Sequence, residues 1–204
     1  MNPILLDFPD SFDTERLTIR APRCGDAPEV VEAVNESLRE LRPWMPWAKE
    51  PAAIEASEVR LRGAMARWIT HEDLLLHIYL KGTSTFVVGS GLHRIDWNSG
   101  KFEIGYWCRT RYSGQGYVTE AVHGITAFAF NRLKANRIEI RCDALNVRST
   151  AVAKRCGFLL EGILRHDSLS VEGNLRSTMV FSKISPNEFN YDREGPTAPI
   201  VPQA

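Results

Sequence analysis

The stretch KFEIGYWCRTRYSGQGYVTEAV, residues 101–122, restricts the fold more than any other part of the sequence. Its first eight residues alternate in the period-two pattern of a strand. Gly114 and Gly116 follow, and the apolar residues within 118–129 then recur at the spacing of one helical face. Because glycine loses more backbone entropy on folding than other residues, this order predicts a strand, a turn that needs bare backbone, and a helix.

A glycine loop between a strand and a helix is a general way to bind phosphate. The first amides of a helix have no intrahelical acceptor, and the helix dipole favours negative charge there. Arg111 precedes the loop and would add positive charge. The loop lacks the third glycine of a dinucleotide-binding fingerprint and the Gly-Lys-Ser/Thr of a P-loop. Taken alone, it fits a tight turn into a helix equally well.

The rest of the chain alternates strand and helix patterns, with no repeat and no low-complexity linker. The predicted strands are 14–20, 74–80, 86–95, 101–108, 136–144, 158–164 and 177–184. The predicted helices are 25–41, 56–69, one after Gly116, and 149–156 with Gly157 as its C-terminal cap. This pattern predicts a single α+β domain over 1–184, with one mixed sheet of six or seven strands and helices on both faces. A proline-containing tail, 185–204, would follow.

The composition argues against several classes of protein. The 25 basic and 25 acidic residues cancel, so no overall field draws the chain to nucleic acid or to a membrane. No run approaches the length of a membrane span, and the first residues lack the basic start and apolar run of a signal peptide. The four scattered cysteines indicate reduced thiols of a cytoplasmic protein, and neither they nor the five histidines have metal-ligand spacing. His71, His77 and His93 belong to no motif and are interpreted as structural.

Three motifs in order resemble the GCN5-related N-acetyltransferase (GNAT) superfamily. The R-x-x-G-x-G of residues 111–116 resembles its coenzyme A signature. The segment NVRSTAVAKRCGF, 146–158, resembles its N-x-x-(A/S)…G-F motif. GYWCRTRYSGQGYVTEA and RPWMPW are similar to the RimJ/RimL branch, which acetylates N-terminal amines of proteins, ribosomal proteins among them. The resemblance covers about 14–184 and implies a mostly antiparallel GNAT sheet.

The resemblance implies acetyl-CoA as co-substrate, with no metal, and direct attack of an amine on the thioester. The pantetheine arm would lie against the backbone of the strand before the loop, although ordinary sheet pairing explains those residues as well. The implied coenzyme-binding residues are Tyr106, Trp107, Cys108, Arg111, Ser113, Gly114, Gln115, Gly116, Tyr117, Asn146 and Ser149. Asn146 would also cap the following helix.

Two residues are candidates for the chemistry. Glu103 lies where the family often carries a strand glutamate and would act as a base through water, unless it is only a solvated or ion-paired carboxylate. Many family members protonate the leaving thiolate with a tyrosine, but that position here is Ala153. Ser149 would then stabilise the thiolate, the alternative being a first-turn helix residue.

The acceptor is the least constrained part. Trp44 and Trp47 lie on a proline-stiffened loop that borders the acceptor channel in this fold, and they either contact the acceptor or pin the loop to the core. A protein N-terminus and a small-molecule amine are both open as acceptors. So are a non-catalytic acyl-CoA-binding module and a different phosphate ligand. Dimers are common in the RimL-like branch, so the resemblance suggests a homodimer, although nothing in the sequence demonstrates one.

Overall fold

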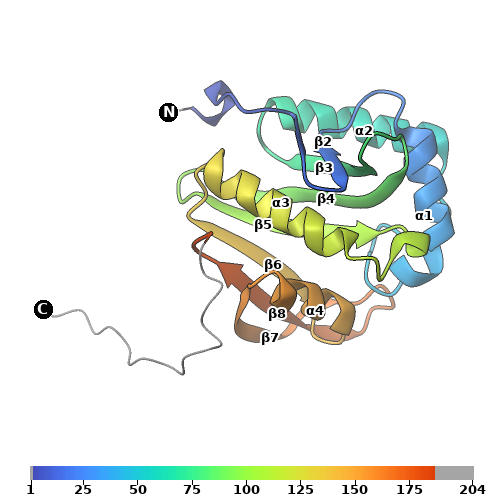
Figure 1. Cartoon of the computed structure of the whole chain (residues 1–204). Coiled ribbons are helices and arrows are strands. Elements are labelled where there is room, and N and C mark those ends of the chain that lie inside the picture. Colours follow the sequence, from blue (N-terminus) through green and yellow to red (C-terminus); the bar gives the residue numbers. More distant parts are fainter. Residues whose placement is uncertain (1, 187–204) are drawn as a thin grey trace, which may run out of the picture.

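The computed structural model describes residues 2–186, which form one eight-stranded sheet with helices on both faces (Figure 1). The strands are β1 (Ser11–Asp13), β2 (Leu17–Arg20), β3 (Leu74–Leu80), β4 (Phe86–Asp96), β5 (Lys101–Cys108), β6 (Arg137–Asp143), β7 (Leu159–Leu169) and β8 (Leu175–Lys183). The helices are α1 (Ala27–Leu41), α2 (Ile54–Ile69), α3 (Tyr117–Asn131) and α4 (Val147–Arg155), with short 3-10 turns at Pro3–Leu5 and Thr110–Tyr112. The order across the sheet is β1-β2-β3-β4-β5-β6-β8-β7.

The alternation of β5 determines which helix covers which face. Phe102 and Ile104 are buried in the main core with Val122 and Ile125 of α3. On the other face, Ala33 of α1 packs in the second apolar cluster with Tyr79 and Phe86. Figure 1 shows α3 lying across the near side of the sheet and α1 at the right-hand end of the strands. The side chains of Glu103 and Trp107 therefore face the α1 side.

The central strand β5 pairs very differently with its two neighbours. Its antiparallel pairing with β4 extends from Val88↔Cys108 to Asp96↔Lys101. Its parallel pairing with β6 stops after three residue pairs, the last being Glu103↔Glu139. Since β6 keeps pairing with β8 as far as Asp143, β5 and β6 separate beyond Glu103. This separation is the opening that the family resemblance implies.

The expected fold class is confirmed, but the expected strand count is wrong. The sheet has eight strands, not six or seven, because β1 also pairs with β2. Its three residues are too few to display an alternating pattern. Helix α4 begins two residues earlier than predicted because Asn146 is its N-cap, and Gly157 has the positive φ of 73° expected after a helix end. The predicted tail lies outside the described residues except for Ser185 and Pro186.

Within residues 2–186, no helix is long and apolar enough to cross a membrane. In the same part of the chain, no group of three or more His, Cys, Asp or Glu side chains is arranged to hold a metal ion.

Candidate functional site

The two loop glycines are required by backbone conformation. Gly114 has φ 77° and Gly116, the N-cap of α3, has φ 84°. Side chains with a Cβ rarely adopt this left-handed region. A Cβ at Gly114 would meet no atom within 4 Å, so at that position the backbone angle and not crowding demands glycine.

The loop leaves a run of amide groups pointing to no protein acceptor. The amides of Tyr112 and Ser113 donate to the carbonyls of Arg109 and Thr110. In the described structure, no acceptor is recorded for the amides from Gly114 to Thr119, and the next one along, Glu120, bonds the Gly116 carbonyl. The free amides therefore begin at Gly114, one residue later than the predicted coenzyme-binding Ser113. Ser113 and Gln115 direct their side chains back to the loop, to the carbonyls of Thr110 and Arg111.

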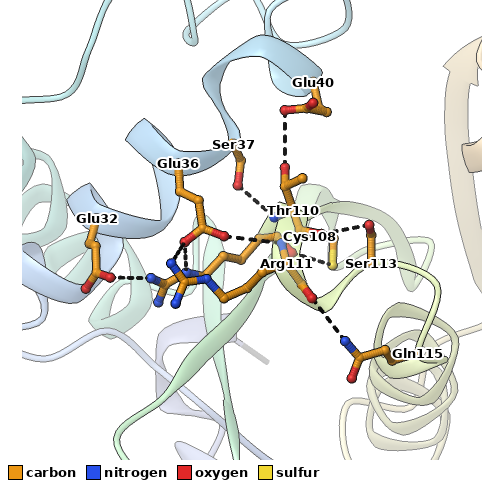
Figure 2. Close-up of polar contacts among 10 residues, drawn as sticks. Glu32, Glu36, Ser37, Glu40, Cys108, Thr110, Arg111, Ser113 and Gln115 are labelled. Carbon is orange, nitrogen blue, oxygen red and sulfur yellow. Dashed lines mark hydrogen bonds and ion pairs between the residues drawn. The ribbon is translucent and has the colours of Figure 1, made fainter.

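Helix α1 holds the base of the loop through a row of acidic side chains (Figure 2). The guanidinium of Arg109, only 3% exposed, donates to both Glu32 and Glu36. Arg111 lies against the same Glu36 carboxylate, with Nη2 at 2.7 Å from Oε2. Burial raises the pKa of Glu36, but the bonds from Arg111 and Arg109 outweigh it and lower that pKa overall. Arg111 is thus ion-paired and not a free cation beside the loop.

A different arginine, which no sequence pattern predicts, lies at the loop. Arg16, just before β2, donates from Nη1 to the Gln115 carbonyl at 3.1 Å and pairs with Glu120 at 2.6 Å. Its guanidinium lies 4.6 Å from the ring centroid of Tyr117. Arg155 of α4 approaches from the other side, with Nε 3.4 Å from Thr119 Oγ1. A start-of-strand arginine carries no pattern that links it to a loop 99 residues away.

The opening between β5 and β6 is bridged at one point by side chains. The Tyr106 hydroxyl is 2.9 Å from Ser149 Oγ and donates to the Ser149 carbonyl at 3.0 Å. Burial raises the pKa of Tyr106, so its phenol stays protonated at neutral pH. A tyrosine hydroxyl therefore does reach this site, from β5 instead of from α4, where Ala153 is fully buried. The family resemblance implies only a backbone role for Tyr106.

Asn146 caps α4 as expected: its Oδ1 accepts from the Ser149 amide at 3.0 Å. This bond fixes the first turn of α4, and with it the position of the Ser149 hydroxyl. Cys108, at the end of β5, is half-buried, and burial raises the pKa of its thiol to about 11.

Glu103 lies where β5 and β6 part. Its side chain is only 18% exposed, and Arg94 Nη1 is 3.5 Å from its carboxylate. Burial raises its pKa, against opposing contributions from Arg94, Arg141 and His93. A raised pKa makes a carboxylate a stronger base than an ordinary exposed one, which suits a group that accepts a proton.

The predicted acceptor side carries two indoles in edge-to-face contact. Trp47 is 45% exposed and packs edge-to-face on Trp107 of β5, with ring centroids 5.8 Å apart. Trp107 lies over Gly89 so closely that a Cβ there would be 2.1 Å from its Nε1. Trp44 is half-buried at the end of α1. Trp47 therefore lies against the site-bearing strand on the α1 face, the face of Glu103.

Comparisons with known proteins agree with this geometry. The family model described as "Acetyltransferase (GNAT) domain" matches residues 16–159. The "Putative ribosomal N-acetyltransferase YdaF" of Bacillus subtilis (strain 168) is 28% identical over 169 residues, 82% of this chain and 91% of that protein. The ribosomal-protein-serine acetyltransferase of Escherichia coli (strain K12) is 36% identical over 63 residues, 31% of this chain and 35% of that protein.

Solved structures have the same fold. The microcin self-immunity acetyltransferase MccE, in complex with acetyl-CoA and AMP, matches with a TM-score of 0.80 and 25% identity over 87% of this chain and 98% of its own. The ribosomal alpha-N-protein acetyltransferase RimL, in complex with coenzyme A, has a TM-score of 0.79 over 85% of this chain and 96% of its own. At 20% identity, that second likeness concerns the fold alone.

The family match covers more than half of the chain, and the matched residues 16–159 include the loop, the opening and the α4 cap described above. The chain belongs to the GNAT acetyltransferase family, in its RimJ/RimL-like branch, and is an acetyl-CoA-dependent N-acetyltransferase.

Proposed function

We propose that the enzyme transfers the acetyl group of acetyl-CoA to the N-terminal α-amine of a protein, with a ribosomal protein as the expected class of acceptor. The separation of β5 from β6, next to a loop of free amides, is the observation that carries this proposal. It leaves one edge of β5 available to a chain-like ligand whose phosphates reach the loop.

In this proposal the coenzyme lies along β5. The amides of Gly114, Gln115, Gly116 and Tyr117 bind the diphosphate, helped by the dipole of α3. The backbone of Tyr106, Trp107 and Cys108 binds the pantetheine arm, and Asn146 bonds its amide from the opposite wall. Arg16 holds the Gln115 carbonyl while it is ion-paired to Glu120, and Arg111 and Ser113 also stabilise the loop.

The chemistry is a direct transfer. The amine nitrogen forms a bond to the acetyl carbon, the carbon–sulfur bond breaks, the amine loses a proton and the departing sulfur gains one. Glu103 takes part in removing the amine proton, through a water molecule. Ser149 stabilises the departing thiolate with its hydroxyl, and Tyr106 orients that hydroxyl from 2.9 Å. Holding both reactants in one opening supplies the entropic part of the acceleration.

An α-amine suits this site better than a lysine. At pH 7 roughly one α-amine in ten is neutral, but only about one lysine side chain in 2,500. An α-amine therefore needs much less help from a base than a lysine side chain does. Trp44 and Trp47 border the face from which a peptide N-terminus would enter, and the ribosomal relatives favour such an acceptor.

The test is acetyl transfer to a panel of peptides that carry the N-terminal sequences of ribosomal proteins. Thiol release from acetyl-CoA measures turnover, and mass spectrometry locates the acetyl group. Each peptide is paired with a copy whose N-terminus is blocked. We expect turnover with the free peptides and none with the blocked ones. Acetylation of lysine in the blocked copies, or of no peptide at all, would contradict the proposal.

A small-molecule amine is the second candidate acceptor. The exposed Trp47 against Trp107 offers an aromatic surface suited to a flat ligand, and the MccE structure contains AMP. Turnover with aminoacyl nucleotides or polyamines, and not with peptides, would favour this candidate. A cytoplasmic setting and a homodimer stay predictions.

A further inference from the structure

A histidine and an aspartate form a bonded pair on the same face as Glu103. Nδ1 of His93, on β4, lies 2.5 Å from Oδ1 of Asp73, the residue before β3. The side chains are 33% and 23% exposed, so the pair is partly desolvated but open to solvent. An imidazole with one nitrogen fixed by a carboxylate has a defined orientation for the other nitrogen.

Two glycines form the floor beneath the imidazole. A Cβ at Gly91 would be 2.6 Å from Cε1 and 2.8 Å from Nε2 of the ring, and one at Gly105 would be 3.3 Å from Nε2. Both glycines are in extended strands and neither has a positive φ, so the backbone angle does not require glycine there. The space that the imidazole ring needs does explain it. Nε2 is the one ring nitrogen near Gly105 of β5, and no bonding partner is recorded for it among residues 2–186.

The ring lies beside the proposed reaction centre. His93 and Glu103 are direct cross-strand partners, and Gly105 is on the stretch of β5 that has left β6. Charged groups face this point from every neighbouring strand: Asp73 before β3, Arg94 on β4, Glu103 on β5, and Glu139 and Arg141 on β6. The sequence interpretation of His93 as a structural residue does not explain why two strands make room for its free nitrogen.

We propose that His93, oriented by Asp73, is a second proton acceptor for the attacking amine, acting from β4 beside Glu103 on β5. This inference rests on the proposed function and adds a catalytic residue to it. As the N–C bond forms and the C–S bond breaks, Nε2 takes the proton that the amine nitrogen releases. Asp73 accepts the Nδ1–H bond throughout and stabilises the imidazolium, which returns its proton to solvent.

Chemical rescue tests this role. In His93→Ala the ring space over Gly91 and Gly105 is vacated, and imidazole in the buffer can occupy it. We expect kcat of the peptide reaction to fall by ~10²-fold, the dissociation constant of acetyl-CoA to stay within about twofold, and imidazole to restore kcat saturably. Among substituted imidazoles of similar size, the restored rate should rise with base strength. Asp73→Asn should lower kcat less, without rescue by imidazole.

His166→Ala is the matched control, because it removes an exposed histidine on β7 that the site does not use. It should keep the original rate and respond to no imidazole. A folded His93→Ala enzyme that retains full kcat, or loses it without rescue, overturns the inference and leaves the proposed function standing. If the unaltered enzyme acetylates no amine, the inference falls together with the proposed function.

Discussion

The two edges of β5 carry the same residues and serve opposite purposes. Along β4 the strand is paired from Lys101 to Cys108, so its backbone groups on that edge are used in the sheet. Along β6 it is paired only from Lys101 to Glu103. An unpaired strand edge is normally a hazard, since it invites other chains to pair. Here the exposed edge ends at a loop of free amides, and we propose that this loop selects a phosphate-bearing ligand instead of another strand.

The comparison explains the placement of the functional side chains. Glu103 is the last residue before the strands part, and Tyr106 reaches across the opening to Ser149. On the paired edge, glycines of β4 leave space for rings: Trp107 lies over Gly89, and His93 lies over Gly91. In the proposed mechanism, coenzyme binding uses the unpaired edge of β5, and the catalytic side chains are held by its paired edge.

The largest expected effect comes from replacing a glycine of the amide loop. Gly114→Val places a β-branched residue at φ 77°, and Gly82→Val does the same at φ 75° in the turn between β3 and β4. Neither Cβ would meet an atom within 4 Å, so the two variants should lose similar stability, about 1–2 kcal/mol. Only Gly114→Val should weaken acetyl-CoA binding, by ~10²-fold, because it shifts the free amides. Calorimetry of both variants measures this; equal affinities would refute the role of the loop.

Glu103→Gln should have the second-largest effect. At pH 7 it should lower kcat by about 10- to 100-fold with little change in acetyl-CoA affinity, as measured by steady-state kinetics and calorimetry. A similar loss in binding would mean that the residue supports the strand and not the reaction.

The same variant has a pH-dependent effect on stability. Because burial raises the pKa of Glu103, the folded protein binds this proton more tightly than the unfolded chain. The group's contribution to stability is fully present below the unfolded carboxyl value of about 4.3 and is lost as pH rises through the higher folded pKa. Glu103→Gln should therefore melt higher than the original protein at pH 7, and the gap should narrow toward pH 4. A difference in melting temperature that does not change with pH would contradict the raised pKa of Glu103 as its cause.

Tyr106→Phe should have the smallest effect of the three. It removes one hydroxyl that contacts Ser149, a loss of about 0.5–1.5 kcal/mol, or roughly two- to tenfold in kcat. Ser149→Ala should lower kcat at least as much, and the double variant should add little to it, because both changes remove the same contact. Fully additive losses would mean that the two hydroxyls act separately.

Much of this architecture could be predicted from the sequence, because local patterns determine it. The alternation of residues 101–108, the two glycines and the cap at Asn146 each act within a few residues, and all appear as expected. The three-residue β1 was missed because it exists only through its pairing with β2. Arg16 beside the loop, the hydroxyl of Tyr106 at Ser149 and the Asp73–His93 pair arise from contacts between distant segments, for which a single sequence has no periodic signal.

Amide hydrogen exchange with and without acetyl-CoA tests the central claim most directly. If the coenzyme uses the free edge of β5 and the loop, protection should increase at residues 104–108 and 114–119, and the paired strand β4 should change little. Protection confined to other segments, or none in these two while acetyl-CoA is bound, would contradict the account.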